Sequence, residues 1–192
     1  DIQVPREERD ARINHVPNAV FGDVTYWGPI VYWDYVQTGD GALSGSNIAQ
    51  ARAAMREIST IAGVTFVLRE NAEPDWIRFQ RSNYNNSPVG KRGGMQIVNI
   101  LDWNYRYIII HELFHSLGFW HEQAAPDRED YVTILYENIW TCCEDQSCAF
   151  NFDIAPGAST YGPYDFDSVM HYQRDAFSVA TGVNTIWVNE PW

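Results

Sequence analysis

The sequence of 192 residues lacks long hydrophobic runs and is poor in basic residues. No stretch approaches the roughly 18 consecutive apolar residues that a membrane-spanning helix needs. Lysine and arginine number 13 against 25 aspartates and glutamates, so the formal net charge at pH 7 is −12. Nucleic acids and acidic membrane surfaces are anionic, so this charge argues against both as partners. Internal repeats and low-complexity tracts are also absent.

Cysteine is scarce, and all three cysteines lie between positions 142 and 148. We expect one disulfide from Cys142 or Cys143 to Cys148, as in a secreted protein, with one thiol left over. A separate metal site is the weaker interpretation, because three sulfurs without a nearby histidine form a poor structural zinc site. The cysteines therefore favour an extracellular protein.

The beginning of the chain lacks an initiator methionine and a signal-like apolar segment. We therefore expect a processed form of a longer protein. Residues 1–18 are polar and charged, and are expected to form an N-terminal arm or a propeptide remnant in which His15 is solvated. With 45% hydrophobic residues in the chain, residues 19–192 are expected to form one domain, built as two lobes around a cleft.

The pattern of hydrophobic residues predicts a first lobe of helices and strands. Four β-branched or aromatic segments are predicted strands, at residues 30–35, 64–68, 76–80 and 95–100. An amphipathic pattern predicts a helix over residues 47–62, with Gly63 as its natural end. A second helix, capped by Asp102 or Asn104, is predicted to follow the last strand. After residue 118 the chain is richer in glycine, proline and aspartate and is expected to be mostly irregular.

The second predicted helix carries the motif H-E-x-x-H-x-x-G-x-x-H, formed by His111, Glu112, His115, Gly118 and His121. Residues four apart share one face of a helix, so His111 and His115 can point to one metal ion. Gly118 can end the helix in a left-handed conformation, after which His121 can return as a third ligand. Imidazole nitrogens suit Zn²⁺, and Glu112 can act as a general base on zinc-bound water. The alternative, three satisfied histidines in a tryptophan-rich core, is disfavoured because burying these groups without a metal is costly.

Three downstream features carry a resemblance to a known family. Ser168-Val169-Met170-His171-Tyr172 resembles the methionine turn that follows this motif in the metzincin metalloproteases. The residue after the third histidine is Glu122, as in the astacins, and Asp127-Arg128-Glu129-Asp130-Tyr131-Val132 resembles the astacin continuation. The chain is therefore identified as an atypical member of the astacin family of zinc metalloproteases, which belongs to the metzincin clan.

The resemblance implies an α+β fold, a metzincin-like zinc-protease domain with two lobes over residues 19–192. Its N-terminal lobe, to about residue 118, would contain a twisted, mostly parallel sheet and two long helices. The C-terminal lobe, residues 119–192, would be largely irregular.

The resemblance also implies roles near the zinc ion. Tyr172 would be a further zinc ligand in the resting enzyme, and would swing away to hydrogen-bond the reaction intermediate. Met170 would lie beneath the metal ligands, as a structural residue like Gly118 and Glu122. In astacins, activation frees an N-terminus that reaches toward the glutamate corresponding to Glu122, and a loose alignment places that start near Ala19.

Several features depart from the family pattern. Ala125 stands where astacins usually have arginine, and the widely spaced disulfides of the family cannot form from the clustered cysteines. The chain ends at Trp192, before the usual C-terminal helix of the family. Phe21-Gly22-Asp23 only approaches the F-x-G-D motif with which astacin propeptides block zinc. An unusual mature enzyme and a form that retains part of its propeptide both fit this pattern.

We therefore predict a secreted, monomeric zinc endopeptidase that hydrolyses peptide bonds in proteins, with Glu112 as general base and Tyr172 stabilising the oxyanion. By the resemblance, Arg174 would favour acidic residues after the scissile bond, whereas a solvated surface arginine is the alternative. If residues 95–100 form an edge strand, Gln96 and Val98 can bind an extended peptide by strand addition; an inner strand is equally consistent.

Two other functions compete with this prediction. One is a proteolytically silent zinc-binding module that recognises proteins, although nothing in the motif is degraded. The other is a serralysin-like metzincin, which shares the tyrosine but conflicts with Glu122 and requires calcium-binding repeats that this sequence lacks.

Overall fold

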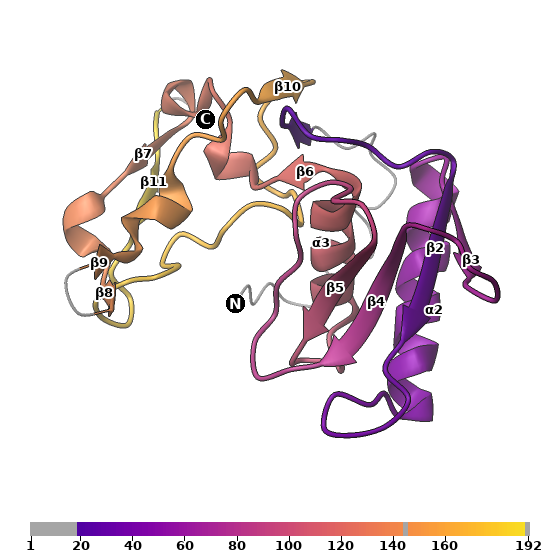
Figure 1. The fold of residues 1–192 in the computed structure, drawn as a ribbon. Helices are drawn as coiled ribbons and strands as arrows, with labels where there is room; N and C mark the ends of the chain where they lie inside the picture. Colours follow the sequence, from indigo (N-terminus) through magenta and orange to yellow (C-terminus); the bar gives the residue numbers. More distant parts are fainter. Residues whose placement is uncertain (1–18, 144–145, 191–192) are drawn as a thin grey trace. The chain divides into compact units, whose positions relative to one another are not determined.

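The computed structural model describes residues 19–143 and 146–190 (Figure 1). The predicted arm at residues 1–18, with His15, lies outside the described residues. Within the described part, the chain forms two units, which divide between Phe119 and Trp120. One unit is Val24–Phe119, and the other joins residues 19–23 to the chain from Trp120 onward.

The unit Val24–Phe119 is built on a four-stranded sheet in the order β3-β2-β4-β5. All three neighbouring pairs are parallel. The strands are β2 (Ile30–Tyr35), β3 (Thr65–Leu68), β4 (Trp76–Arg81) and β5 (Met95–Ile100). The four predicted strands and the mostly parallel sheet are therefore confirmed. Parallel neighbours need a long crossover connection, which helix α2 (Gly45–Ile61) provides between β2 and β3.

Helix α2 begins with a capping box. The Ser44 side chain accepts a hydrogen bond from the Asn47 backbone, and the Asn47 side chain accepts one from the Ser44 backbone. Such a cap contributes about 1 kcal/mol. The buried residues of the helix are Ala51, Ala54, Met55 and Ile58. Gly63, with a φ of 63°, follows the end of the helix, as the sequence predicts.

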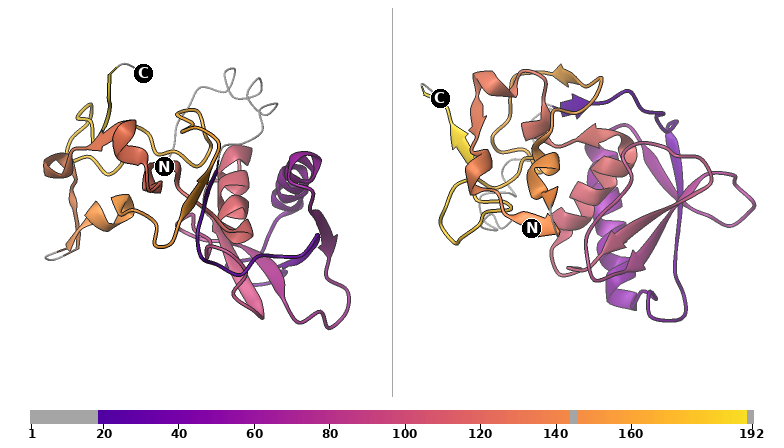
Figure 2. Two further views of the ribbon diagram at one scale, coloured as in Figure 1. Left: turned by 90° about the horizontal axis from the view of Figure 1, so that it is seen from above. Right: turned by 60° about the vertical axis from the view of Figure 1, so that its left-hand side comes forward.

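Helix α3 (Arg106–Leu117) packs against α2, and both helices lie on the same face of the sheet (Figures 1 and 2). Alternate strand residues such as Ile77, Phe79 and Val98 are fully buried. Burying each of these side chains contributes about 1.5–3 kcal/mol. The sheet and the two helices thus form a close-packed core that holds α3 in place.

The two ends of α3 differ in how well the sequence predicts them. Its N-cap is Tyr105, which makes no side-chain capping hydrogen bond, so the predicted cap at Asp102 or Asn104 is wrong. Asp102 instead accepts the Tyr105 N–H through its backbone carbonyl, which places it one turn too early to cap. At the other end, Gly118 adopts a left-handed conformation with a φ of 112° and donates to the His115 carbonyl, as predicted.

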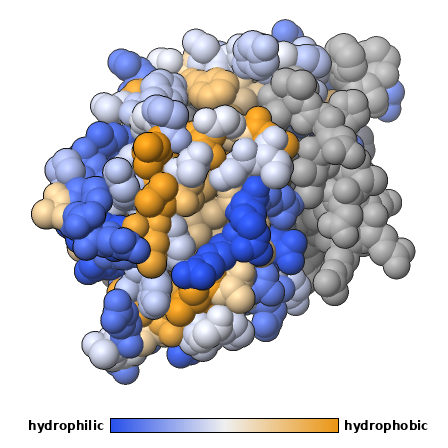
Figure 3. Space-filling model, turned by 90° about the vertical axis from the view of Figure 1, so that its right-hand side faces the viewer, coloured by the Kyte–Doolittle hydropathy of each residue, from blue (hydrophilic) through white to orange (hydrophobic). Residues whose placement is uncertain are grey.

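A groove of about 390 Å³ lies between α2 and the sheet of this unit. Figure 3 shows strongly hydrophilic and hydrophobic side chains close together on the face of the molecule that it presents. The groove is lined by Trp33, Arg52, Met55, Arg56, Ser59, Thr65, Phe66 and Leu68. None of these residues belongs to the histidine motif.

The other unit consists of short strands, 3₁₀ turns and irregular segments, which confirms the largely irregular C-terminal lobe. Its strands are β1 (Ala19–Phe21), β7 (Val132–Ile134), β8 (Thr141–Cys143), β9 (Gln146–Ser147), β10 (Ser159–Tyr161) and β11 (Ile186–Val188), while β6 (Phe119–Trp120) spans the boundary. Its 3₁₀ turns are η1 (Glu122–Ala124), η2 (Arg128–Asp130), η3 (Tyr136–Asn138) and η4 (Cys148–Phe152). The pairs β1–β10, β7–β11 and β8–β9 are all antiparallel.

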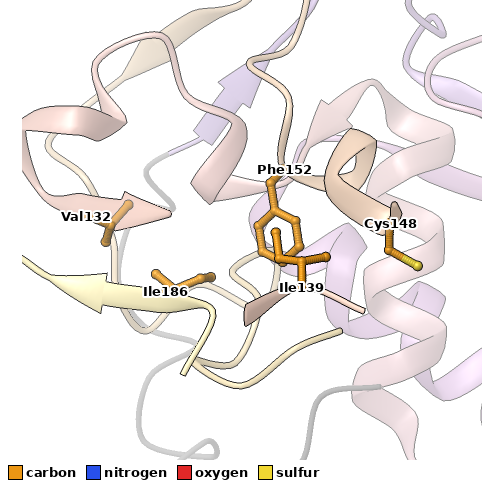
Figure 4. Packing of buried hydrophobic residues seen from close by; sticks show 5 residues of the cluster. All are labelled: Val132, Ile139, Cys148, Phe152 and Ile186. Carbon is orange, nitrogen blue, oxygen red and sulfur yellow. The ribbon is translucent and has the colours of Figure 1, made fainter. Parts of the chain in front are cut away.

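The irregular unit has its own hydrophobic core (Figure 4). The buried residues of this core are Val132, Ile139, Cys148, Phe152 and Ile186. Tyr172 and Phe177 pack against it. Cys148 is disulfide-bonded, as predicted, whereas its predicted partners Cys142 and Cys143 are not among the residues whose side chains the structure describes. A disulfide supports a segment with so little regular structure.

No helix among the described residues is both long enough and apolar enough to cross a membrane.

Candidate metal centre

Helix α3 brings His111 and His115 together. Their Nε2 atoms lie 3.1 Å apart, and the two rings stand at an interplanar angle of 88°. Two nitrogens bound to one tetrahedral zinc ion at about 2.0–2.1 Å are separated by about 3.4 Å. The two imidazoles are therefore placed for a single ion, as the spacing of four residues predicts.

The protonation of His115 follows from its second contact. Its Nδ1 lies 2.9 Å from the Phe119 carbonyl, which can only accept, so Nδ1 carries the proton. Burial lowers the pKa of His115 to about 4, so the ring is neutral at pH 7. A neutral imidazole protonated at Nδ1 presents the lone pair of Nε2 toward His111. Metal-bound histidines commonly donate their other N–H to a backbone carbonyl in this way.

Backbone contacts hold the end of α3 in position. The His115 carbonyl accepts hydrogen bonds from the N–H groups of both Gly118 and Gly90, at 2.9 and 2.8 Å. The Trp27 indole donates to the Ser116 carbonyl at 2.9 Å. These bonds satisfy carbonyls that a helix end otherwise leaves without partners. The sequence motif alone does not reveal the contributions of Gly90 and Trp27, because both lie far from it along the chain.

His121 follows Gly118 by three residues, so the glycine turn determines where the third imidazole can reach. The metal-ligating atoms of His111, His115 and His121 all lie within 4.8 Å of one another. The triad predicted from the sequence is thus brought together and is positioned to bind a metal ion. Three imidazole nitrogen donors in this arrangement fit Zn²⁺.

Glu112 lies on α3 next to the first histidine of the triad. The residue is only 5% exposed, and its Oε2 atom has no hydrogen-bond partner among the described residues. Burial raises the pKa of Glu112 to about 8. A buried carboxylate without a partner is costly, and a bound cation nearby would offset that cost. The buried Glu112 side chain, like the three histidines, therefore indicates that this site suits a positive ion.

The methionine turn is tied to the segment that carries the third histidine. The Glu122 N–H donates to the carbonyl of the buried Met170 at 3.0 Å. Two residues later, the Tyr172 N–H donates to Oε1 of Gln123, also at 3.0 Å. The rings of Tyr172 and His121 lie 4.3 Å apart, centroid to centroid. Met170 and Tyr172 thus lie beside the segment that begins at His121.

Glu122 is also deeply buried, at 2% exposure. Its Oε1 accepts a hydrogen bond from the Asp165 N–H at 3.0 Å, whereas Oε2 has no partner in the described part of the chain. Burial raises the pKa of Glu122 to about 7. Its backbone and one oxygen therefore anchor neighbouring segments, consistent with the structural role predicted for it.

The predicted substrate-binding residues lie in different environments. Arg174 is exposed, and its role in specificity stays a prediction. Val98 is fully buried, so its side chain cannot contact a substrate. Gln96 is buried too, and its amide group bonds the Gly90 carbonyl and the Arg92 N–H, both at 3.1 Å. A role of these two strand residues in binding substrate would therefore have to come from their backbone.

Strand β5 is not a simple sheet edge. Asn86 forms an isolated antiparallel bridge to Asn99, with both backbone hydrogen bonds present at 3.1 and 2.9 Å. The segment that leads from β4 to β5 thus covers β5 at this position. The sequence does not reveal this pairing, because a single bridge has no hydrophobic periodicity.

Together these features define a class of protein: a zinc-binding domain of the metzincin type, with three motif histidines, a glycine turn and a methionine turn. Comparison with known families is more specific. The family model described as Astacin, a family of peptidases, matches residues 24–191. The chain therefore belongs to the astacin family of zinc metalloproteases, and its cofactor is Zn²⁺.

Individual relatives agree with this assignment. High choriolytic enzyme 1 of Oryzias latipes is 36% identical over 170 residues, which cover 83% of this chain and 61% of that protein. Tolloid-like protein 1 of Homo sapiens is 37% identical over 178 residues, which cover 90% of this chain and 17% of that protein. The chain thus spans less than two thirds of the length of these curated relatives.

Solved structures support the same fold. The structure of high choriolytic enzyme 1, a hatching enzyme zinc-protease from Oryzias latipes, matches with a TM-score of 0.74 and 34% identity. This match covers 85% of this chain and 80% of that one. A structure of myroilysin matches with a TM-score of 0.60 at 18% identity, covering 86% of this chain and 89% of that one, which concerns the fold alone.

Proposed function

We propose that this chain, loaded with zinc, is an endopeptidase that hydrolyses peptide bonds in proteins. The observation that carries the proposal is the proximity of three histidine ligand atoms, two of them on helix α3, which also carries the buried Glu112. Bound Zn²⁺ supplies a Lewis acid that polarises a carbonyl and lowers the pKa of a bound water. The proton transfers and the stabilisation of the oxyanion depend on side chains of the protein.

Glu112 is the general base in this proposal. Its Oε2 has no hydrogen-bond partner among the described residues, so a lone pair is available to take a proton from water. The protonated carboxyl group then donates the proton to the leaving amine. Burial raises the pKa of Glu112 in the metal-free protein, and a positive ion close by favours the ionised form that a base requires. One residue can thereby serve both proton transfers.

Tyr172 is proposed to act on the oxygen of the scissile carbonyl. Its ring packs against the ring of His121, with centroids 4.3 Å apart. The phenol therefore lies next to the third proposed zinc ligand. We infer that the phenol ligates zinc at rest and donates to the oxyanion during the reaction. Removing one such donor costs about 3–4 kcal/mol of transition-state stabilisation.

The proposed substrates are proteins or peptides outside the cell. The disulfide at Cys148 favours an oxidising compartment, and one relative is described as a hatching enzyme zinc-protease. Arg174 is exposed in the segment just after the methionine turn. We propose that it favours acidic residues after the scissile bond.

The test compares casein cleavage by the zinc-loaded protein and by Glu112→Gln. The glutamine keeps the size of the side chain but cannot take a proton. We expect both proteins to bind one zinc ion, and the variant to lose about 10²–10⁴-fold in kcat. Equal cleavage by the two would refute the role of Glu112. Zinc binding without any turnover by the wild type would instead support a silent recognition module.

A further inference from the structure

Both polar backbone groups of Tyr172 are bonded to side chains of the same unit. Its N–H donates to Oε1 of Gln123 at 3.0 Å. Its carbonyl oxygen accepts from Nδ1 of His171 at 2.6 Å. Tyr172 lies in an irregular segment, where no helix or strand ladder fixes the backbone. Two side chains thus replace the regular hydrogen bonds that this residue lacks.

Gln123 is suited to hold this position. Its side chain is fully buried, and it lies two residues after His121 in turn η1. Its own carbonyl accepts a hydrogen bond from the buried guanidinium of Arg128 at 2.9 Å. Within the described residues, Nε2 of Gln123 has no partner, so the contact with Tyr172 is the side-chain hydrogen bond that Gln123 contributes.

His171 is held at both ring nitrogens. A carbonyl can only accept, so Nδ1 carries the proton that is donated to Tyr172. The hydroxyl group of Tyr164 faces Nε2, and a hydroxyl can donate to a ring nitrogen that carries no proton. Nε2 therefore accepts the hydroxyl proton of Tyr164 at 2.6 Å. Tyr164 in turn stacks on Tyr131, with centroids 4.8 Å apart and an interplanar angle of 13°.

With the backbone fixed, the ring of Tyr172 can move only about its own side-chain bonds. The ring lies 4.3 Å from that of His121, and it makes an edge contact with Phe152 at 5.7 Å. Since the pivot of the side chain is its Cα atom, a displaced backbone would move the phenol away from His121. A misplacement of about 1 Å can cost on the order of 100-fold in rate.

We propose that Gln123 and His171 are positioning residues for Tyr172. They hold its backbone so that the phenol stands beside the third zinc ligand. This inference rests on the proposed function, in which the phenol of Tyr172 acts at the metal. Neither residue needs to touch substrate or metal, and Gln123 is the cleaner position to test because its side chain makes the simpler set of contacts.

The experiment compares three variants in the full chain, and a fourth, Tyr172→Phe, serves as the spectroscopic reference. Gln123→Met keeps the length of the side chain but removes the acceptor, and it also removes the buried Nε2. Gln123→Glu keeps an oxygen that can accept from Tyr172, while burying a carboxyl group. Asn138→Leu is the control, since it removes a hydrogen bond of the same unit, from Nδ2 to the Asn184 carbonyl at 2.7 Å, that does not involve Tyr172.

The first readout is spectroscopic. Copper(II) replaces zinc on imidazole ligands, and a phenolate bound to copper(II) gives a charge-transfer absorption band in the visible range. We expect the band in the wild type, its loss or displacement in Gln123→Met, and its retention in Gln123→Glu and Asn138→Leu. Tyr172→Phe, which abolishes the phenol, identifies the band. A band that is unchanged in Gln123→Met, or absent from the wild type, would overturn the inference.

The second readout is kinetic and thermal. Gln123→Met should lower kcat of the zinc-loaded protein by roughly 10–100-fold with KM nearly unchanged. Gln123→Met leaves the Tyr172 N–H without its acceptor, so its midpoint of thermal unfolding should fall about as much as that of Asn138→Leu. Gln123→Glu and Asn138→Leu should also unfold earlier than the wild type, yet keep kcat. Rates that follow thermal stability across the three variants would show a merely structural role. Absence of cleavage by the wild type refutes the proposed function, and the copper band then decides the inference alone.

Discussion

The Nδ1 atom of His115 donates a hydrogen bond to the carbonyl of Phe119 across 2.9 Å. Phe119 directly follows Gly118, whose left-handed conformation ends helix α3. The turn that ends the helix therefore also selects the tautomer of the second histidine. The turn at Gly118 thereby orients His115 as a metal ligand and also directs the chain toward the third ligand, His121.

Gly118→Ala should disturb this turn severely. A Cβ atom at Gly118 would lie 2.7 Å from Cε1 of Tyr26, and a φ of 112° is strained for any L side chain. We expect a loss of about 1–3 kcal/mol in unfolding free energy and a roughly 10–100-fold loss of zinc affinity. Urea unfolding and competition with a chelator measure the two effects.

Gly63→Ala is the matched control for that substitution. Gly63 also has a positive φ, but a Cβ atom there would meet nothing within 4 Å. The Gly63→Ala variant should lose stability without losing zinc affinity. If the two alanine variants bound zinc equally well, the turn at Gly118 would have no role in preparing the site.

The stability of the metal-free protein should depend on pH through Glu112. Burial raises the folded-state pKa of this carboxyl group from 4.5 to about 8. Between these values the folded state binds more protons than the unfolded state, so the free energy of unfolding falls as pH rises from about 4.5 toward 8. The contribution of Glu112 is on the order of 2–4 kcal/mol over that range.

Urea unfolding of the metal-free wild type and of Glu112→Gln at pH 5.5, 7 and 8 isolates this effect. Other titrating groups are common to both proteins and cancel in the difference. The wild type should lose stability relative to the variant as pH rises. Parallel pH profiles would mean that Glu112 is not held in a desolvated site.

Gln96 offers a test of two roles. Its amide group bonds the Gly90 carbonyl and the Arg92 N–H, and Gly90 donates to the His115 carbonyl. Gln96→Leu would leave these two backbone groups without their partner, which costs about 1–3 kcal/mol of stability for each buried group. Thermal unfolding should therefore shift downward with little change in KM for peptides. A raised KM at unchanged stability would instead support the substrate-binding role predicted from the sequence.

Arg174 should affect which peptides are cleaved rather than how fast the best neutral peptide is cleaved. An exposed charge pair contributes about 0.2–1 kcal/mol, so Arg174→Ala should lower the preference for aspartate or glutamate after the scissile bond by roughly two- to fivefold. Peptide-library profiles of both proteins measure this preference, and identical profiles would leave Arg174 without a role in specificity.

The sequence predicts the parts of this protein that depend on local spacing. The interval of four between His111 and His115, together with Gly118, suffices to predict two ligands on one helix face and the turn toward the third. Strands and helices of the first unit follow from their hydrophobic periodicity, because each buries one face against a common core.

Features made by distant segments were not predictable in the same way. The contact of Gly90 with His115, and the bridge from Asn86 to Asn99, join loops to elements far away in the sequence. Such contacts leave no periodic pattern, and a loop rich in Asn, Ser and Gly indicates only that regular structure is absent. The predicted cap of α3 is wrong for a related reason. Two residues with capping side chains, Asp102 and Asn104, lie close to the helix start, but the helix begins after Tyr105 and neither side chain caps it.

Gln123 is the clearest example of a residue whose role cannot be predicted from the sequence. In the sequence it is a polar residue after Glu122, with no spacing that indicates a role. In the fold its amide group meets the backbone of Tyr172, which lies 49 residues further along the chain. Only the three-dimensional arrangement connects it to the proposed chemistry.

The need for zinc can be tested by restoring the metal to the metal-free protein. The wild-type protein, stripped with a chelator and dialysed, should cleave neither casein nor gelatin. Adding back one equivalent of Zn²⁺ should restore cleavage in the wild type, with His121→Ala failing to retain zinc and Glu112→Gln retaining it without cleavage. A wild type that binds one zinc ion per chain and cleaves neither protein would contradict the account.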